Sequence, residues 1–153
     1  MASTPLPNSV SSFRQAIGLA LLLGETQPDS SIAICLSKAF VVQTVRSTTG
    51  TTIELVAQLL SGRPAKIGDH LLVLTHSPIP LGGVSDSDLF TYSLLRHTGE
   101  LVGRRLLDWV ATDGDDIRSF AYLTHPVSAW RGDPAPSRRV DFRASTASDP
   151  TRT

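Results

Sequence analysis

The spacing of the apolar residues changes along the chain, and each change predicts a different kind of element. Between Phe13 and Leu23 the apolar residues mostly recur at three- or four-residue intervals, which indicates a helix that Gly24 can end. A second, short helix is expected over residues 31–38, with Asp29 or Ser30 as its cap. The chain therefore opens with two predicted helices.

The next three segments have the composition or the alternation of strands. Residues 40–46 are rich in β-branched side chains, and residues 52–60 alternate loosely between apolar and polar positions. Residues 66–75 contain the continuous apolar run from Leu71 to Leu74, which is typical of a central strand. Turn signals at residues 48–50 and 61–64 join these segments into two successive hairpins, so an antiparallel meander is expected.

The last part of the domain begins with a loop, because residues 76–83 combine two prolines with two adjacent glycines. Ser85 or Asp86 can cap a helix that ends at Gly99. Residues 102–110 fit either a helix or a strand, residues 112–116 form an acidic turn, and residues 117–124 are expected to form the final strand. This order predicts an α+β domain with an antiparallel β-sheet flanked by helices.

Both ends of the chain have a different composition from its middle. Residues 1–12 and 131–153 are rich in Ser, Thr and Pro and have few apolar positions. Such segments bury too little apolar surface to offset the entropy of ordering. We expect a flexible N-terminal segment over residues 1–12, a single domain over residues 13–130 and a disordered C-terminal tail over residues 131–153, with both ends dispensable for folding.

Composition and charge exclude several classes of protein. Of the 153 residues 41% are hydrophobic and 18% charged, and 14 basic residues balance 14 acidic ones. A chain without net charge has no general attraction to nucleic acid or to anionic lipid. The apolar run from Ala16 to Gly24 is too short to cross a bilayer. We therefore expect a soluble cytoplasmic protein with neither a nucleic-acid nor a membrane partner.

No cofactor or metal is implied by the motifs. A single cysteine, Cys35, excludes an internal disulfide and a zinc site with several thiolates, and no two histidines are spaced four apart. The chain has neither a phosphate-binding loop with its lysine nor a nucleophile elbow.

Two stretches carry candidate binding chemistry. In the first, a buried strand delivers His76 and Ser77 into a rigid loop, where binding groups are often displayed. In the second, Gly103 followed by Arg104 and Arg105 can present backbone N–H groups and a guanidinium to a carboxylate. The alternatives are that His76 is a surface or capping histidine, and that the arginines pair with Glu100 or Asp108 in a solvated basic segment.

The order of features resembles the chorismate lyase-like family. The residues that carry the resemblance are Leu21-Leu22-Leu23-Gly24, Asp29-Ser30-Ser31-Ile32, Val41-Val42-Gln43-Thr44-Val45, Thr75-His76-Ser77-Pro78-Ile79 and Leu101-Val102-Gly103-Arg104-Arg105-Leu106-Leu107. The resemblance implies a sheet with flanking helices that enclose a pocket for a small organic molecule. Val56 stands where the lyases use an arginine, and the expected final strand lacks their glutamate. Chorismate lyase activity itself is therefore not expected.

The resulting hypothesis is an enzyme of specialised metabolism that carries out an elimination, isomerisation or intramolecular cyclisation on a small, carboxylate-bearing molecule. In this hypothesis His76 and Glu54 are catalytic, and Ser77, Gly103, Arg104 and Arg105 bind the substrate, without a metal or cofactor. Two alternatives stay open: a non-catalytic small-molecule-binding domain and a protein-interaction module. An enclosed pocket would favour the first two functions, and a flat exposed apolar patch the third.

Overall fold

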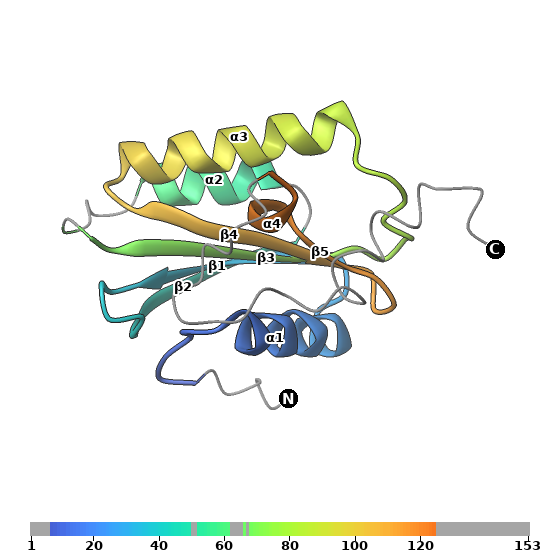
Figure 1. The fold of residues 1–153 in the computed structure, drawn as a ribbon, viewed down its shortest axis with the longest axis horizontal. Coiled ribbons are helices and arrows are strands. Elements are labelled where there is room, and N and C mark those ends of the chain that lie inside the picture. The colour runs from blue at the N-terminus through green and yellow to red at the C-terminus, as the bar shows by residue number, and fades with distance from the viewer. Residues whose placement is uncertain (1–6, 50–51, 62–65, 67, 125–153) are drawn as a thin grey trace.

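A computed structural model describes residues 7–49, 52–61, 66 and 68–124. It is an α+β fold with a five-stranded sheet between helices (Figure 1). In chain order the elements are α1 (Phe13–Thr26), β1 (Ser30–Leu36), β2 (Val42–Thr49), α2 (Thr52–Leu60), β3 (His70–His76), α3 (Asp86–Leu101), β4 (Arg105–Thr112), β5 (Ile117–Ser119) and α4 (Phe120–Thr124).

The strands lie in the order β2-β1-β3-β4-β5. Strand β1 is antiparallel to both β2 and β3, β3 is parallel to β4, and β4 is antiparallel to β5. The sheet is therefore mixed, and the prediction of a purely antiparallel sheet was wrong. The reason is α3, which carries the chain from the end of β3 back to the start of β4, as a parallel pair requires.

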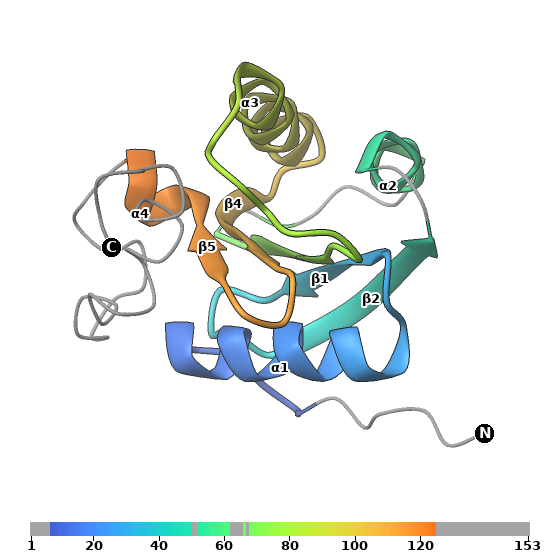
Figure 2. The same ribbon diagram turned by 90° about the vertical axis from the view of Figure 1, so that its right-hand side faces the viewer.

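Helix α1 covers one face of the sheet, and α2 and α3 cover the other (Figures 1 and 2). Strands β1 and β3 point their side chains alternately to the two faces and contribute to both cores. Each strand therefore contains a continuous apolar run, Ile32–Leu36 in β1 and Leu71–Leu74 in β3. Leu72 and Leu74 are fully buried on the α1 side, and Leu71 and Val73 on the other side. The prediction that the apolar run from Leu71 to Leu74 belongs to a central strand is confirmed.

Two element types were predicted wrongly. Residues 31–38 were expected to be a helix, but Ser30–Leu36 is β1, a strand buried on both faces. Such a strand lacks an alternating pattern and resembles a buried helix in sequence. Thr52–Leu60 was expected to be a strand, but it is α2, whose Leu55, Val56 and Leu59 are buried at helical spacing.

The C-terminal half follows the prediction more closely. Ser85 caps α3 as expected, and the open alternative for residues 102–110 is decided in favour of strand β4. The expected final strand stops at Ser119, and the next residues form α4. The buried Asp108 carboxylate explains this change, because it accepts hydrogen bonds from Ser119 Oγ (2.6 Å) and from the backbone N–H of Ala121 (3.0 Å) at the start of the helix.

The start of the domain differs from the expected boundary at Phe13. Val10 is fully buried in the α1-side core, and its backbone N–H donates to Phe40 O (3.0 Å). The expected tail over residues 131–153 and most of the turn at residues 61–64 lie outside the described residues. Within the described part of the chain, no helix has both the length and the apolar character needed to cross a membrane.

Candidate functional site

The candidate site lies at the carboxyl ends of the parallel strands β3 and β4. Ligands of open α/β sheets bind outside the carboxyl ends of parallel strands. Here those ends are paired, His76 opposite Thr112. Ser77 and Asp113 directly follow them, and we refer to these four residues as the carboxyl edge.

His76 is partly exposed and lies on the α1 side of the sheet, the side of Leu72 and Leu74. Its imidazole packs against Gly24 of α1 so closely that a Cβ at that position would overlap the ring. Its Nε2 also lies 4.0 Å from the place of a Cβ on Gly114, in the turn between β4 and β5. Among the described residues, the buried ring nitrogen Nδ1 has no hydrogen-bond partner. The position of the ring is thus set by its packing against Gly24 and not by a hydrogen bond of Nδ1.

Ser77 has a structural task. Its backbone N–H donates to Thr112 O (2.8 Å), which extends the pairing of β3 and β4 by one residue. Its hydroxyl donates to Ile79 O (2.7 Å) and accepts from Ile79 N–H (3.2 Å), which closes a tight turn. The hydroxyl expected to bind substrate therefore shapes the loop that follows β3.

The far end of this loop is held by a buried cation on the α3 side of the sheet. Arg118 of β5 is 2% exposed; its Nη2 donates to Gly82 O and its Nη1 lies 3.5 Å from Asp88 Oδ2. Its guanidinium also lies 5.7 Å from the ring centre of Phe120. Burial lowers the pKa of Arg118, and the neighbouring Asp88 carboxylate partly opposes that shift.

The Asp113 carboxylate anchors the middle of the same loop. It accepts from the backbone N–H groups of Leu81 (2.9 Å), Asp115 (2.8 Å) and Asp116 (2.8 Å). Burial alone would raise the pKa of Asp113, but these hydrogen bonds to its charged form leave the pKa lowered. Arg118, Asp88 and Asp113 were not among the predicted site residues. Asp113 was assigned to an ordinary acidic turn, and the other two meet only through the fold.

A small polar network lies at the same end of β3 on the face covered by α2 and α3. Thr75 Oγ1 lies 2.9 Å from Ser31 Oγ and accepts a hydrogen bond from Trp109 Nε1 (2.9 Å). Ser31 and Trp109 are buried, and Thr75 is partly exposed. The only sequence signal for this network was the change from apolar to polar residues at the end of β3.

Glu54 and His76 are separated by the sheet. Glu54 stands in the first turn of α2, where its Oε2 accepts from Thr48 Oγ1 (3.0 Å). Helix α2 packs on the face of Ala33 and Cys35, whereas the His76 ring points to the α1 face. The two residues predicted to be catalytic are thus not brought together.

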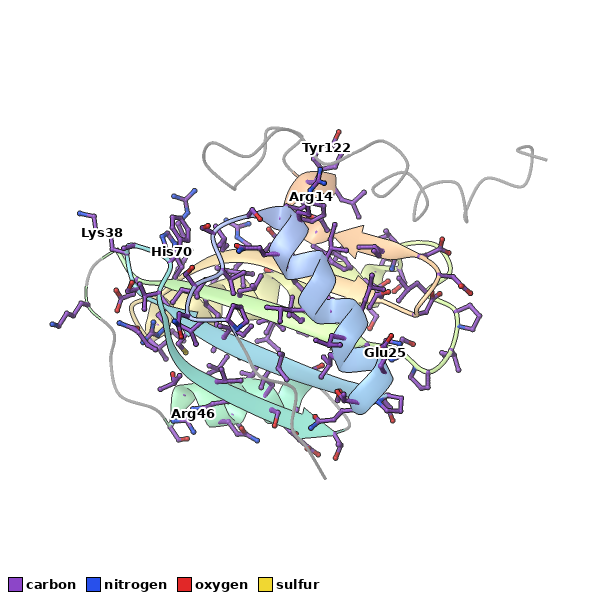
Figure 3. All side chains as sticks on the ribbon, turned by 90° about the horizontal axis from the view of Figure 1, so that it is seen from below. Arg14, Glu25, Lys38, Arg46, His70 and Tyr122 are labelled. Atoms are coloured by element: carbon purple, nitrogen blue, oxygen red, sulfur yellow. The ribbon has the colours of Figure 1, made fainter. Side chains whose placement is uncertain are left out.

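The predicted arginine site lies at the opposite end of β3. Arg105 pairs with His70, the first residue of β3, and His76 is its last. That length of strand is about 20 Å. Figure 3 shows His70 at one end of the sheet and Glu25, the neighbour of Gly24, at the other. One small molecule cannot contact both Arg104 and His76.

Arg104 joins the end of β1 to the starts of β2 and β3. Its Nη1 donates to Gln43 Oε1 (2.9 Å), Leu36 O (3.2 Å) and His70 O (3.4 Å) and lies 3.8 Å from Asp69 Oδ2. Gly103 precedes it with a φ of 80°, which a side chain would disfavour. Arg105 is exposed. The structure shows Arg104 bound to the protein itself, through Asp69 rather than the expected Glu100 or Asp108.

Comparisons with known proteins add no functional assignment. No family model matches the chain, and no curated protein matches it either. Within the described residues, no group of three or more His, Cys, Asp or Glu side chains could hold a metal ion. The resemblance to the chorismate lyase-like family rests on the sequence motifs alone, and the carboxyl edge is the candidate site that the geometry supplies.

Proposed function

We propose that this chain is a non-catalytic binding domain for a small organic molecule, which occupies the carboxyl edge on the α1 side. The observation that carries the proposal is His76, a partly exposed imidazole that ends a parallel strand and packs against Gly24 of α1. A histidine in that position donates to or accepts from a ligand oxygen, such as that of a carboxylate or a hydroxyl.

The surroundings of His76 favour binding with little rearrangement. Arg118 and Asp113 fix the loop after β3, and the His76 ring packs directly against Gly24. Fixing the binding groups before the ligand arrives lowers the entropy cost of association. Thr112 of β4 lies opposite His76 and pairs on its other side with Ile117 of β5. Ile117 is a partly buried apolar side chain on the same face of the sheet as His76. The ligand thus meets one polar group beside an apolar one.

Catalysis is less well supported than binding. The enzymatic hypothesis gives proton transfer to His76 and Glu54, and these lie on opposite faces of the sheet. A general acid and a general base must both reach the reacting atoms, within about 3 Å or through one water. A reaction at the carboxyl edge could therefore use one of the two residues at most.

Native mass spectrometry of the freshly purified full chain tests the proposal. We expect an added mass below about 1 kDa, typical of a small organic ligand, that disappears on denaturation. His76→Gln should reduce the occupied fraction, with binding weakened about tenfold or more, as for loss of a hydrogen bond to a charged group. His97→Gln is the matched control, because His97 is an exposed histidine on α3. The proposal is wrong if no small molecule is bound, or if Arg104→Ala releases it and His76→Gln does not.

A further inference from the structure

The charged side chains of the described residues are separated toward the two ends of β3. One end, which we call the basic pole, has four cations around His70, the first residue of the strand: Lys38, Lys66, Arg104 and Arg105. Figure 3 shows Lys38 and His70 at this end of the sheet and Glu25 at the other. The balance of 14 basic and 14 acidic residues therefore conceals a local excess of positive charge.

The buried residue Asp69 holds the segments of three of these cations together. Its Oδ2 lies 3.8 Å from Arg104 Nη1 and accepts from the backbone N–H of Lys66 (3.1 Å). The backbone O of Asp69 accepts from Arg105 N–H (3.1 Å). Asp69 is 6% exposed, so it positions the basic pole but offers little negative charge to solvent.

The basic pole is open to solvent, because Lys38, Lys66 and Arg105 are exposed. The aliphatic part of Lys38 packs on Gly68, where its Cδ lies 3.1 Å from the place of a Cβ. This contact joins the loop after β1 to the loop before β3. Glu100, in the last turn of α3, is a second carboxylate at this end. Among the described residues the cations of this end still outnumber its carboxylates.

The opposite end of β3, which we call the acidic pole, carries the opposite charge. Three exposed carboxylates each adjoin in sequence a residue that lies against His76 or pairs with it: Glu25 after Gly24, Asp29 before Ser30 and Asp115 after Gly114. Arg118, a cation near this end, is buried and faces Asp88, so it does not neutralise these carboxylates. Negative charge is thus displayed around the carboxyl edge.

The two poles are separated by the length of β3, about 20 Å. One copy cannot bring its own poles into contact, but two copies can, and complementary charge both steers two surfaces together and orients them. We propose that the basic pole of one copy docks on the acidic pole of a second copy. The contact joins two different surfaces, so each end of the assembly keeps one free pole and association is head-to-tail and open-ended. The contact does not require a ligand at the carboxyl edge.

Sedimentation of the full chain at two salt concentrations tests the contact. At about 10 mM salt the Debye length is about 30 Å, and at about 150 mM it is about 8 Å. In low salt the mean mass should rise with protein concentration beyond that of two chains, and the association constant should fall about tenfold or more in the higher salt. A wild type that is still monomeric at about 1 mM protein in low salt overturns the proposal. A mass that stops at two chains overturns the head-to-tail arrangement.

One variant from each pole separates the two surfaces. Arg105→Glu and Asp115→Lys should each weaken self-association about five- to tenfold, because each turns an attraction between exposed charges into a repulsion. Arg105→Glu keeps its acidic pole and Asp115→Lys keeps its basic pole. An equimolar mixture should therefore associate more strongly than either variant alone and form mainly dimers. A mixture that associates no more strongly than its components overturns the proposal.

Arg46→Glu is the matched control for net charge. Arg46 is exposed in the middle of β2, opposite Ala33, and its substitution changes the net charge as much as Arg105→Glu does. It should associate like the wild type, and its mixture with Asp115→Lys should grow beyond two chains. Equal weakening by Arg46→Glu and Arg105→Glu overturns the proposal, because net charge alone is then the cause. Lys38→Glu, in the loop after β1, should repeat the effect of Arg105→Glu, so the result does not depend on how one variant folds.

Discussion

Arg118 and Asp88 form an ion pair in which the cation is almost completely buried. Their Nη1 and Oδ2 atoms are 3.5 Å apart, with the Arg118 side chain 2% exposed and that of Asp88 31% exposed. Asp88 also accepts from Ser85 N–H (2.9 Å) in the capping box of α3. The pair therefore connects β5 to the start of α3, across the loop that follows β3.

Loss of the Asp88 charge should destabilise the domain. Asp88→Asn can still cap α3, but it removes the carboxylate that pairs with the buried Arg118, at a cost of about 1–3 kcal/mol. Urea unfolding measures the loss, and hydrogen exchange should quicken in residues 77–85. Asp86→Asn removes an exposed charge from the same turn and should change the stability by less than about 0.5 kcal/mol. Equal effects of the two substitutions would show that the ion pair is not what stabilises the loop.

The stability of the domain should fall as the pH is lowered through the range of histidine. Burial and, to a smaller extent, the charge of Arg105 lower the pKa of His70, and Asp69 partly opposes them. Between the folded pKa and the ordinary value of about 6.5 the unfolded chain binds more protons, so stability is retained above about pH 6.5 and decreases below it. The melting temperature of His70→Gln should depend less on pH between 7.5 and 5.5 than that of the wild type. Identical pH profiles would exclude His70 as the cause.

Two glycines of α1 should respond differently to alanine. Gly18 is exposed with nothing within 4 Å of an added Cβ, so Gly18→Ala should stabilise the helix by about 0.5–1 kcal/mol. At Gly24 the added Cβ meets the His76 ring, so Gly24→Ala should lack this gain and should shift the NMR signals of the imidazole. A gain equal to that of Gly18→Ala, with unchanged His76 signals, would mean that the ring is not held against α1.

Removal of a buried side chain from β3 should have a large effect. Leu72 is fully buried, so Leu72→Ala should cost about 2–5 kcal/mol in chemical unfolding. Leu101 is 77% exposed at the end of α3, and Leu101→Ala should cost less than about 0.5 kcal/mol. A small loss for Leu72→Ala would contradict the central position of β3.

The residues before α1 should contribute to stability, contrary to the expectation from composition. Val10→Ala removes most of a fully buried side chain and should cost about 1–2 kcal/mol. Ser11→Ala, at an exposed neighbour, is the control. If Val10→Ala has the same melting temperature as the wild type, residues 7–12 are as dispensable as their composition predicts.

The sequence predicted an element correctly where its pattern had one interpretation. The periodicity of α1, the apolar run of β3 and the Ser85 cap of α3 each gave the right element. β1 was missed because burial on both faces removes the alternation, and α2 because Leu55 and Leu59 fit either period. At the site, the position of His76 at a strand end was predicted. The Arg118–Asp88 pair was not, because no local pattern brings together residues from β5 and α3.

The central position of β3 also bears on how the chain folds. On one side β3 pairs with β1, from Ser30 opposite His76 to Leu36 opposite His70. On the other side it pairs with β4, which follows β3 in the chain only after α3. Among the described strands, only the hairpin of β1 with β2 and the pairing of β4 with β5 are local. Loop-closure entropy must be overcome before the distant contacts form, which slows two-state folding. Folding is therefore expected to be slower than that of a helical bundle of this size, with the docking of β3 between β1 and β4 as its rate-limiting event.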